Sequence, residues 1–242
     1  MAHLRVGTSG YAYKKWKGSF YPEKLPQNEM LKFYAQHFPT VEINYTFYRM
    51  PAESVLAGWA AQVSGEFQFA LKLNQQITHI KKLRDAGSTL QRFLEVASVL
   101  QQEGRLGPIL VQLPPTFRAD LAVLDEFLKL RPRAFRFAVE VRHASWYAEE
   151  FYALLRTHET ALCIAETDDF SPPLMLTTDF TYLRLRRTDY KPKEIAAWRK
   201  TVDGWLAGGT DAYVYFKHEE AGKGAAYAKK LVTSGETLNP ES

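Results

Sequence analysis

The chain has 242 residues, of which 46% are hydrophobic and 24% are charged, and its formal net charge is +4. This length and composition are ordinary for one globular domain. No window holds the roughly 18 apolar residues of a membrane span, and the N-terminus lacks a charged region followed by an apolar one. The single cysteine, Cys163, excludes an internal disulfide and lies in an apolar run. We therefore expect a cytoplasmic protein with no membrane partner, and the basic balance suggests anionic partners.

Eight short runs rich in β-branched or aromatic residues predict β-strands, and each has six to eight residues. The predicted strands are Leu4–Ser9, Val41–Tyr48, Phe67–Asn74, Pro108–Leu113, Phe135–Arg142, Ala161–Thr167, Thr181–Arg187 and Ala212–His218.

Amphipathic patterns between these runs predict helices. They cover Asn28–Phe38, Ala52–Val63, Ser88–Gln102, Leu121–Leu130, Ala148–Thr157, Glu194–Leu206 and Ala225–Val232. Pro51 suits the first turn of the second helix, where a missing N–H costs nothing. Asp120 suits the N-cap of the fourth helix.

Strand alternating with helix eight times predicts a parallel sheet. Eight repeats favour closure into a single-domain TIM-type (β/α) barrel of eight parallel strands, and an open α/β sheet is the alternative. We expect the barrel to span residues 1–233, with a flexible C-terminal tail over residues 234–242.

Polar residues gather at the C-terminal ends of the predicted strands, where active sites of such barrels lie. Many of them are two positions apart, which places them on the same face of a strand. The alternative is a structural ion-pair network inside the barrel. We rank a functional site above it, because buried charges are costly unless something uses them. The residues are Glu42, Asn44, Lys72, Asn74, Gln112, Glu140, Arg142, His143, Glu166, Asp168, Arg184, Arg186, Lys217, His218 and Glu219.

The ends of the predicted strands and the loops after them are strongly basic. Together they hold 18 Lys or Arg and 8 Asp or Glu, whereas the rest of the chain holds 13 basic and 19 acidic residues. The windows counted are 11–25, 45–50, 72–84, 114–118, 140–147, 166–173, 184–193 and 217–223. One basic end on an otherwise acidic barrel predicts a surface for an anionic ligand, either nucleic acid or a phosphorylated small molecule.

Two of these segments carry more specific signals. In the first, lysines alternate with Tyr11, Tyr13 and Trp16, a pattern that suits phosphate contacts and base stacking, although rim packing explains it equally well. In the last, Gly222-Lys-Gly224 directly precedes a predicted helix, and barrels often bind phosphate there. The chain has no Walker loop and no Gly-x-Gly-x-x-Gly, so no nucleotide-cofactor motif is present.

Several motifs follow one another along the chain, namely Gly7–Tyr11, Trp16–Pro22, Val41–Asn44, Phe47–Arg49, Thr78-His79, Gln112–Pro115 and Glu140–Trp146. In these motifs the chain resembles the YecE-like family, domain of unknown function number seventy-two, from about Val6 to Leu231. The resemblance implies a (β/α) barrel with its site at the mouth and supplies no reaction, and it adds Thr78, His79 and Trp146 to the candidate binding residues. The chain departs from the family pattern at Arg186-Arg187 and at Lys217-His218-Glu219, so no role is carried over there.

The family's fold is also similar to xylose isomerase-like barrels, which include metal-dependent endonucleases that act on abasic DNA. Those enzymes need several His, Asp and Glu ligands at the mouth, and Glu140 with His143 has a spacing that suits one divalent metal. The lysines and arginines in the same region disfavour a site for several metals. Candidate ligands are His79, Glu140, His143, Glu166, Asp168 and His218.

Three functions fit these patterns. The first is an enzyme acting on a phosphate ester, in which Lys72, Arg142 and Arg184 hold the anion and Glu140 or His143 is the general acid or base. The second is a non-catalytic protein that binds nucleic acid or a nucleotide. The third is a sugar-type hydrolase or isomerase that uses Glu140 and Glu166. Neither the substrate nor the oligomeric state follows from the sequence.

Overall fold

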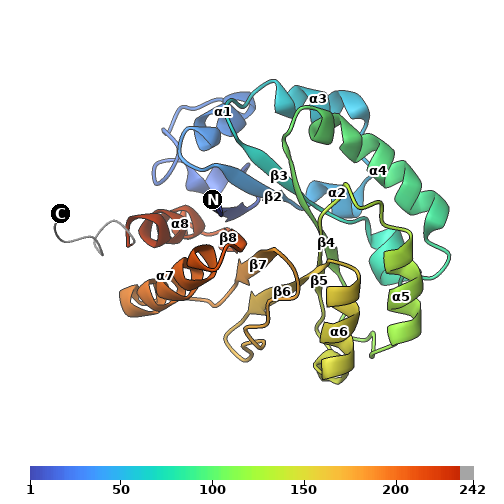
Figure 1. Ribbon diagram of the computed structural model, residues 1–242. Helices are drawn as coiled ribbons and strands as arrows, with labels where there is room; N and C mark the ends of the chain where they lie inside the picture. The colour runs from blue at the N-terminus through green and yellow to red at the C-terminus, as the bar shows by residue number, and fades with distance from the viewer. Residues whose placement is uncertain (235–242) are drawn as a thin grey trace.

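The computed structural model describes residues 1–234 of the chain, so the predicted tail lies outside the described residues except for Ser234. Eight parallel strands form a closed barrel in chain order, with the last strand pairing with the first (Figure 1). This confirms the TIM-type barrel and excludes the open sheet.

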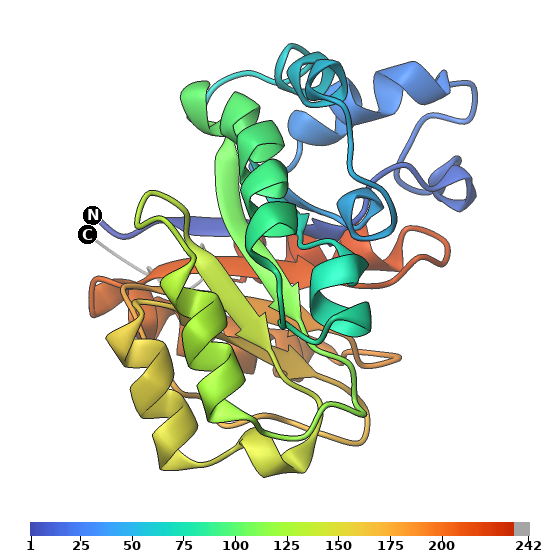
Figure 2. The same cartoon turned by 90° about the vertical axis from the view of Figure 1, so that its right-hand side faces the viewer.

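The strands agree closely with the predicted runs, most of them within two residues at each end. Figure 2 shows them running from left to right, so their C-terminal ends and the loops that follow lie at one end of the molecule. Their bounds are β1 Leu4–Ser9, β2 Thr40–Ile43, β3 Gln68–Lys72, β4 Leu106–Gln112, β5 Phe137–Glu140, β6 Ala161–Glu166, β7 Phe180–Leu185 and β8 Asp211–Phe216.

The helices lie around the outside of the barrel (Figures 1 and 2). No helix within the described residues is long and apolar enough to cross a membrane. Four short helical turns, Lys14–Trp16, Gln27–Glu29, Gln76–Ile80 and Ala144–Trp146, lie in the loops. The α-helices are α1 Met30–Ala35, α2 Tyr45–Tyr48, α3 Glu53–Ala60, α4 Gly87–Gln102, α5 Leu121–Lys129, α6 Glu149–Thr157, α7 Pro192–Ala207 and α8 Lys223–Thr233.

The predicted strand Val41–Tyr48 is wrong in its second half. The chain leaves the sheet at Asn44 and forms α2, in which the Phe47 N–H donates to the Asn44 carbonyl oxygen at 3.1 Å. The aromatic residues of this segment have high β propensity, but here they pack over the barrel mouth instead of against a neighbouring strand. Pro51 is also misplaced in the prediction, because α3 begins two residues later, at Glu53.

The core has two layers that alternate along each strand. Side chains such as Leu183 and Leu185 belong to the large cluster between the sheet and the helices. Tyr182, Tyr215 and Ala165 belong to a smaller cluster, which we assign to the barrel interior because neighbouring residues point to opposite faces. The polar residues in phase with this inner cluster therefore point into the barrel above it.

The predicted N-cap of α5 is confirmed, since the Val123 N–H donates to Asp120 Oδ1 at 3.1 Å. We expect Asp120→Ala to lower the free energy of unfolding by about 1 kcal/mol, because the first turn of the helix loses its acceptor. Asp120→Asn is the matched control: it keeps an acceptor while it weakens the ion pair with Arg84. Urea unfolding of both variants tests the cap, and an equal loss in the two would assign the effect to the charge.

Candidate anion site at the barrel mouth

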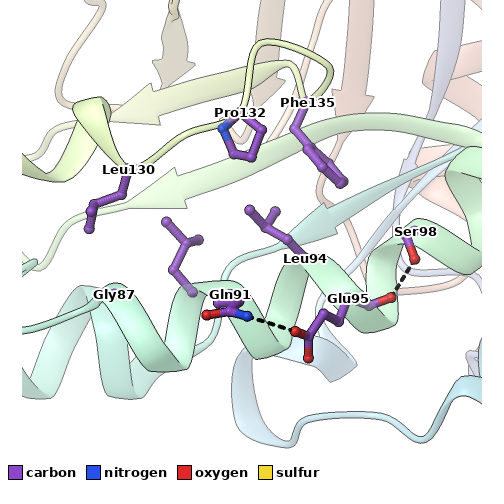
Figure 3. Close-up of a pocket in the computed structure, with 9 residues that line it drawn as sticks. Gly87, Gln91, Leu94, Glu95, Ser98, Leu130, Pro132 and Phe135 are labelled. Carbon is purple, nitrogen blue, oxygen red and sulfur yellow. Dashed lines mark hydrogen bonds between the residues drawn. The ribbon is translucent and has the colours of Figure 1, made fainter.

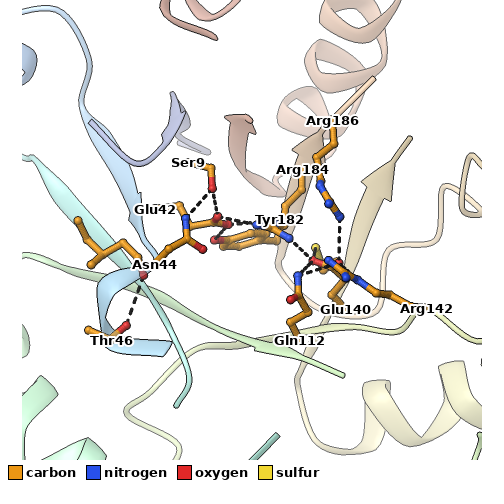
Figure 4. Close-up of polar contacts among 12 residues, drawn as sticks. Ser9, Glu42, Asn44, Thr46, Gln112, Glu140, Arg142, Tyr182, Arg184 and Arg186 are labelled. Carbon is orange, nitrogen blue, oxygen red and sulfur yellow. Dashed lines mark hydrogen bonds and ion pairs between the residues drawn. The ribbon is translucent and has the colours of Figure 1, made fainter. Parts of the chain in front are cut away.

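Two carboxylates and one guanidinium form a buried cluster at the C-terminal end of the barrel (Figure 4). Arg184 of β7 contacts Glu42 of β2 through Nε and Nη2, at 2.9 and 2.8 Å, and contacts Glu140 of β5 through Nη1 at 2.6 Å. The side chains of both carboxylates are 0% exposed and that of Arg184 is 2% exposed. The cluster therefore ties three strands together across the barrel.

Neutral groups complete the hydrogen bonding of the two carboxylates. Gln112 Nε2 lies 2.9 Å from each oxygen of Glu140. The Tyr182 hydroxyl donates to Glu42 at 2.8 Å, and the Ser9 hydroxyl donates to the other Glu42 oxygen. Asn44 extends the chain of contacts by donating to Ser9 Oγ at 2.9 Å (Figure 4). Each carboxylate is thus fully engaged, as buried charges must be to avoid a large penalty.

Burial by itself would raise the pKa of both carboxyl groups. The Arg184 guanidinium outweighs burial and holds the pKa of Glu42 below its usual range. Arg184, Arg142 and Arg186 together hold the pKa of Glu140 far below its usual range. Both groups are therefore ionised at neutral pH. The expectation that Glu140 exchanges a proton as a general acid or base does not fit this geometry, because its two oxygens are saturated with donors.

Two further arginines contact Glu140 (Figure 4). Arg142 Nε donates to Glu140 Oε1 at 2.9 Å, and Arg186 Nη1 lies 3.6 Å from the same oxygen. Their side chains are 30% and 22% exposed. The buried Nε of Arg186 has no hydrogen-bond partner among the described residues. These guanidiniums keep donors available for a ligand, whereas the charge of Arg184 is neutralised by the two glutamates.

Lys72 of β3 is the fourth cation of the mouth and is 8% exposed. Its Nζ lies 3.8 Å from the centre of the Phe47 ring, which α2 places over the barrel. Burial, followed by the nearby charge of Arg184, lowers the pKa of Lys72 to about 8. The lysine is therefore less firmly protonated than an exposed one.

Thr78 and His79 follow β3 in the turn Gln76–Ile80 and lie next to this lysine. Thr78 Oγ1 lies 2.9 Å from His79 Nδ1, and the imidazole packs edge-on against Phe47 at 4.9 Å between ring centres. Burial and the charges of Lys72 and Arg142 lower the pKa of His79, so its ring is neutral at neutral pH. The mouth thus gains a neutral imidazole among its cations.

A pocket of about 370 Å³ lies on the β7 and β8 side of the mouth. Its lining includes Arg186, Lys217 and His218, Lys223 from the first turn of α8, and the acidic Glu219 and Glu220. His218 Nε2 contacts the Arg187 carbonyl oxygen, and its buried Nδ1 has no partner among the described residues. Burial, followed by the charges of Arg186 and Arg184, lowers the pKa of Lys217. The lysine is therefore both desolvated and close to other cations.

A second pocket, of about 310 Å³, lies on the β1 and β2 side of the mouth. Aromatic side chains line it, namely Tyr11, Tyr13, Tyr45 and Trp59, together with Asn44. The Tyr13 hydroxyl donates to the Ser9 carbonyl oxygen at 2.6 Å, which fixes the ring. Tyr11 and Tyr13 thus line a cavity beside the charged cluster, as do Tyr45 and Trp59, which no sequence pattern had selected.

Glu166 is not part of the mouth. It follows Ala165, which faces the interior, and therefore points outward toward α7. There its Oε2 accepts hydrogen bonds from the Tyr190 hydroxyl at 2.7 Å and from Trp198 Nε1 at 3.1 Å. Asp168 is likewise occupied, since it accepts from the Thr188 N–H and hydroxyl. A sugar-type mechanism that pairs Glu140 with Glu166 is therefore disfavoured.

Three other candidates have structural partners. Trp16 and Trp146 are completely buried, and their indole N–H groups donate to the carbonyl oxygens of Glu219 and Phe117. His143 caps the turn Ala144–Trp146 by accepting from the Ser145 N–H at 3.2 Å. Large aromatic side chains in loops look like ligand contacts in a sequence, but here they fill the space between the loops and the barrel.

The described residues contain no group of three or more His, Cys, Asp or Glu side chains that could hold a metal ion. Glu140 already accepts from Gln112, Arg142 and Arg184, and His143 is turned toward Ser145. The pair expected to bind one divalent metal therefore does not fit that role.

A hollow of about 610 Å³ lies away from the mouth (Figure 3). Leu94 and Gln91 of α4 line it together with Leu130, Pro132 and Phe135. It is a mainly apolar groove, and Glu95 is the one charged residue in its lining. The mouth remains the candidate functional site.

Fold and site together define a closed (β/α) barrel with a cation-rich mouth built over a buried Glu–Arg–Glu cluster. The chain belongs to the family described as "Protein of unknown function DUF72", whose model matches residues 5–240. UPF0759 protein YecE of Escherichia coli (strain K12) is 37% identical over 120 residues, which are 49% of this chain and 43% of that protein. UPF0759 protein YunF of Bacillus subtilis (strain 168) is 26% identical over 141 residues, 55% of this chain and 50% of that protein. The chain thus spans about half the length of the curated relatives it matches.

Solved structures support the same fold. A DUF72 family protein from Thermotoga maritima has a TM-score of 0.81 and 26% identity, covering 97% of this chain and 99% of that one. A DUF72 family protein from Enterococcus faecalis has a TM-score of 0.82 and 19% identity over 99% of both chains. An AP endonuclease of family 2 from Brucella melitensis has a TM-score of 0.56 and 12% identity over 94% of this chain and 98% of that one. The last two similarities, at 19% and 12% identity, show only that the barrel fold is shared.

Proposed function

We propose that this protein is an enzyme that binds a phosphate-bearing substrate at the barrel mouth. The observation that carries the proposal is the excess of positive charge there. Lys72, Arg142, Arg186 and Lys217 surround Glu42 and Glu140, and Arg184 already compensates much of the charge of these carboxylates. A dianionic phosphate would relieve the repulsion among the remaining cations.

The pocket lined by Arg186, Lys217 and His218 is the proposed phosphate site. The buried Nε of Arg186, unpaired among the described residues, is a donor that a phosphate oxygen would satisfy. His218 Nε2 faces the Arg187 carbonyl oxygen and therefore carries the ring proton, so the buried Nδ1 is an acceptor that a ligand hydroxyl would satisfy. The first turn of α8 borders the same pocket, and backbone N–H groups at a helix start favour anions. In barrels of this type, the loops after the seventh and eighth strands frequently bind phosphate.

The aromatic pocket is the proposed site for the rest of the substrate. Tyr11, Tyr13, Tyr45 and Trp59 offer ring faces, and Asn44 offers an amide at the border with the charged cluster. Apolar walls with a few polar groups are typical of small-molecule sites. The substrate would then extend from the β8 side of the mouth to the neighbouring β1 side, since β1 pairs with β8.

We expect inorganic phosphate to bind the wild-type protein at low ionic strength, with Arg186→Met weakening the affinity roughly 10- to 100-fold, which is the value of a hydrogen bond to a charged group. Isothermal titration calorimetry measures this directly. Arg92→Met, on the exposed face of α4, removes the same charge far from the pocket and should leave the affinity within about twofold. Equal affinities in the two variants would contradict the proposed phosphate site.

A second candidate is a non-catalytic protein that binds single-stranded nucleic acid. Lys14 and Lys15 are exposed in the loop after β1, next to the aromatic pocket. Their charges suit a phosphate backbone and the aromatic rings suit bases. The likeness to an AP endonuclease adds no mechanism to this candidate. Anisotropy of labelled DNA across a salt series separates the two functions, since a steep salt dependence without turnover would favour binding alone.

A further inference from the structure

Lys72 differs from the three arginines of the mouth because, among the described residues, it has no ion pair. Within residues 1–234 its ammonium group makes no ion pair and no hydrogen bond, and its one described side-chain interaction partner is the Phe47 ring, 3.8 Å away. Arg142, Arg184 and Arg186, in contrast, all contact Glu140. An amine that is bound to no carboxylate is free to react.

Charged groups from several elements face this amine. Arg184 of β7 and Arg142, which follows β5, disfavour its protonation. Glu42 and Glu140 favour its protonation, but more weakly than burial and Arg184 oppose it. The nearby His79 is neutral at neutral pH and adds no charge. With a pKa of about 8, roughly a tenth of the amine is unprotonated at pH 7, which is about 300 times the fraction for an ordinary lysine. Desolvation and neighbouring cations are the means by which enzymes activate lysine as a nucleophile.

We propose that Lys72 is a Schiff-base lysine that condenses with the aldehyde or ketone carbon of a phosphate-bearing carbonyl compound, such as an open-chain sugar phosphate. This inference rests on the proposed function for the position of the phosphate, which Arg186 and Lys217 would hold beyond β7 and β8. The position of Lys72 on the opposite part of the rim then places the reactive carbon away from the phosphate, over the centre of the mouth.

The chemistry balances without a further reactant. The lone pair of the neutral Lys72 amine forms a bond to the carbonyl carbon, and the carbonyl π electrons move to its oxygen. One proton transfers from nitrogen to that oxygen, and one proton is taken from solvent. The oxygen then leaves as water while the carbon–nitrogen double bond forms. The product is a protonated iminium that carries one positive charge.

The surroundings of Lys72 suit this product. The face of the Phe47 ring stabilises a cation at the position of the lysine nitrogen, and an iminium carries its charge there as well as an ammonium does. The buried location restricts water, which would hydrolyse the iminium. An iminium withdraws electrons from the adjacent carbon, so bond cleavage or formation at that carbon is the class of reaction that follows.

Borohydride-type trapping tests the proposal. The wild-type protein is incubated at about pH 7 with glyceraldehyde 3-phosphate and sodium cyanoborohydride, which reduces an iminium to a stable secondary amine, and peptide mapping by mass spectrometry locates the modified lysines. We expect Lys72 to be modified roughly 100-fold faster than exposed Lys24, because far more of its amine is neutral. The rate at Lys72 should rise with pH and level off above about 8.

Glyceraldehyde without phosphate and the Lys72→Arg variant are the controls. Lys72→Arg keeps the charge and cannot form an iminium, and Lys24→Arg should leave trapping at Lys72 unchanged. Modification of Lys72 no faster than that of Lys24 would overturn the Schiff-base proposal, whatever the phosphate titrations show. Equal trapping at Lys72 with both aldehydes, unaffected by Arg186→Met, would support the reactive lysine and overturn the phosphate site instead.

Discussion

Replacing Arg184 by methionine should lower the free energy of unfolding by about 3–5 kcal/mol. The variant would leave Glu42 and Glu140 buried without their shared cation, and the hydrogen bonds at 2.6 to 2.9 Å would be lost. Removing one partner of a buried ion pair costs far more than the intact pair contributes, because the remaining charge stays desolvated. Urea unfolding followed by circular dichroism measures the loss.

Arg184→Lys and Arg136→Met provide the comparisons for this result. Lysine keeps the charge but cannot reach both carboxylates, so an intermediate loss is expected and the variant remains measurable if Arg184→Met does not fold. Arg136 pairs with Asp211 at 2.8 Å at the opposite end of the barrel, where its side chain is 40% exposed. Its removal should cost about 1 kcal/mol or less. A similar cost for Arg184→Met would show that the buried cluster contributes little to stability.

Acid should destabilise the protein steeply through the same cluster. The pKa values of Glu42 and Glu140 are depressed in the folded protein, so the two groups contribute stability above the unfolded value of about 4.5. This contribution is lost as the pH falls below that value, because the unfolded chain binds protons that the folded protein does not. Each carboxylate adds a slope of up to about 1.4 kcal/mol per pH unit. Urea unfolding between about pH 7 and about pH 3 measures the slope.

In Glu140→Gln the free energy of unfolding should fall less steeply as the pH is lowered. The slope should be smaller by up to about 1.4 kcal/mol per pH unit, the contribution of one carboxylate. Glu126→Gln is the matched control, because its side chain is 74% exposed on α5 and its ion pair with Lys129 lies at the surface. An unchanged slope in Glu140→Gln would mean that folding does not shift the pKa of Glu140. A steeper slope would mean that folding raises this pKa, so that Glu140 holds a proton in the folded protein. That result would restore the general acid role which the saturated hydrogen bonding argues against.

The buried cluster combines the two interpretations that the sequence left open. Glu42, Glu140 and Arg184 form the ion-pair network expected of a structural core, and they are shielded from solvent. Arg142 and Arg186 contact Glu140 of that network, and their side chains are partly exposed. We infer that the first three position the reactive groups, and that a ligand contacts the residues above them.

The barrel and the position of its mouth follow from local patterns along the chain. Strand-forming runs alternate with amphipathic ones eight times, and a spacing of two puts Glu140 with Arg142, and Arg184 with Arg186, on one face. The sequence also indicates which residues of β6 face the barrel interior. Ala161, Cys163 and Ala165 alternate and are small enough to fill the barrel, which leaves Glu166 on the outer face. A ranking by charge alone therefore misplaced Glu166, whose position in the alternation assigns it to the outer face.

Tertiary packing alone decided which polar groups remain available to a ligand. Whether an arginine is paired with a carboxylate depends on strands that are far apart in the sequence. Arg184 and Glu42, for example, are 142 positions apart. The loop aromatics show the same dependence, since Trp16 and Trp146 are buried while Tyr45 is 48% exposed. Free energies of burial and pairing are properties of the assembled surroundings, so no local pattern contains them.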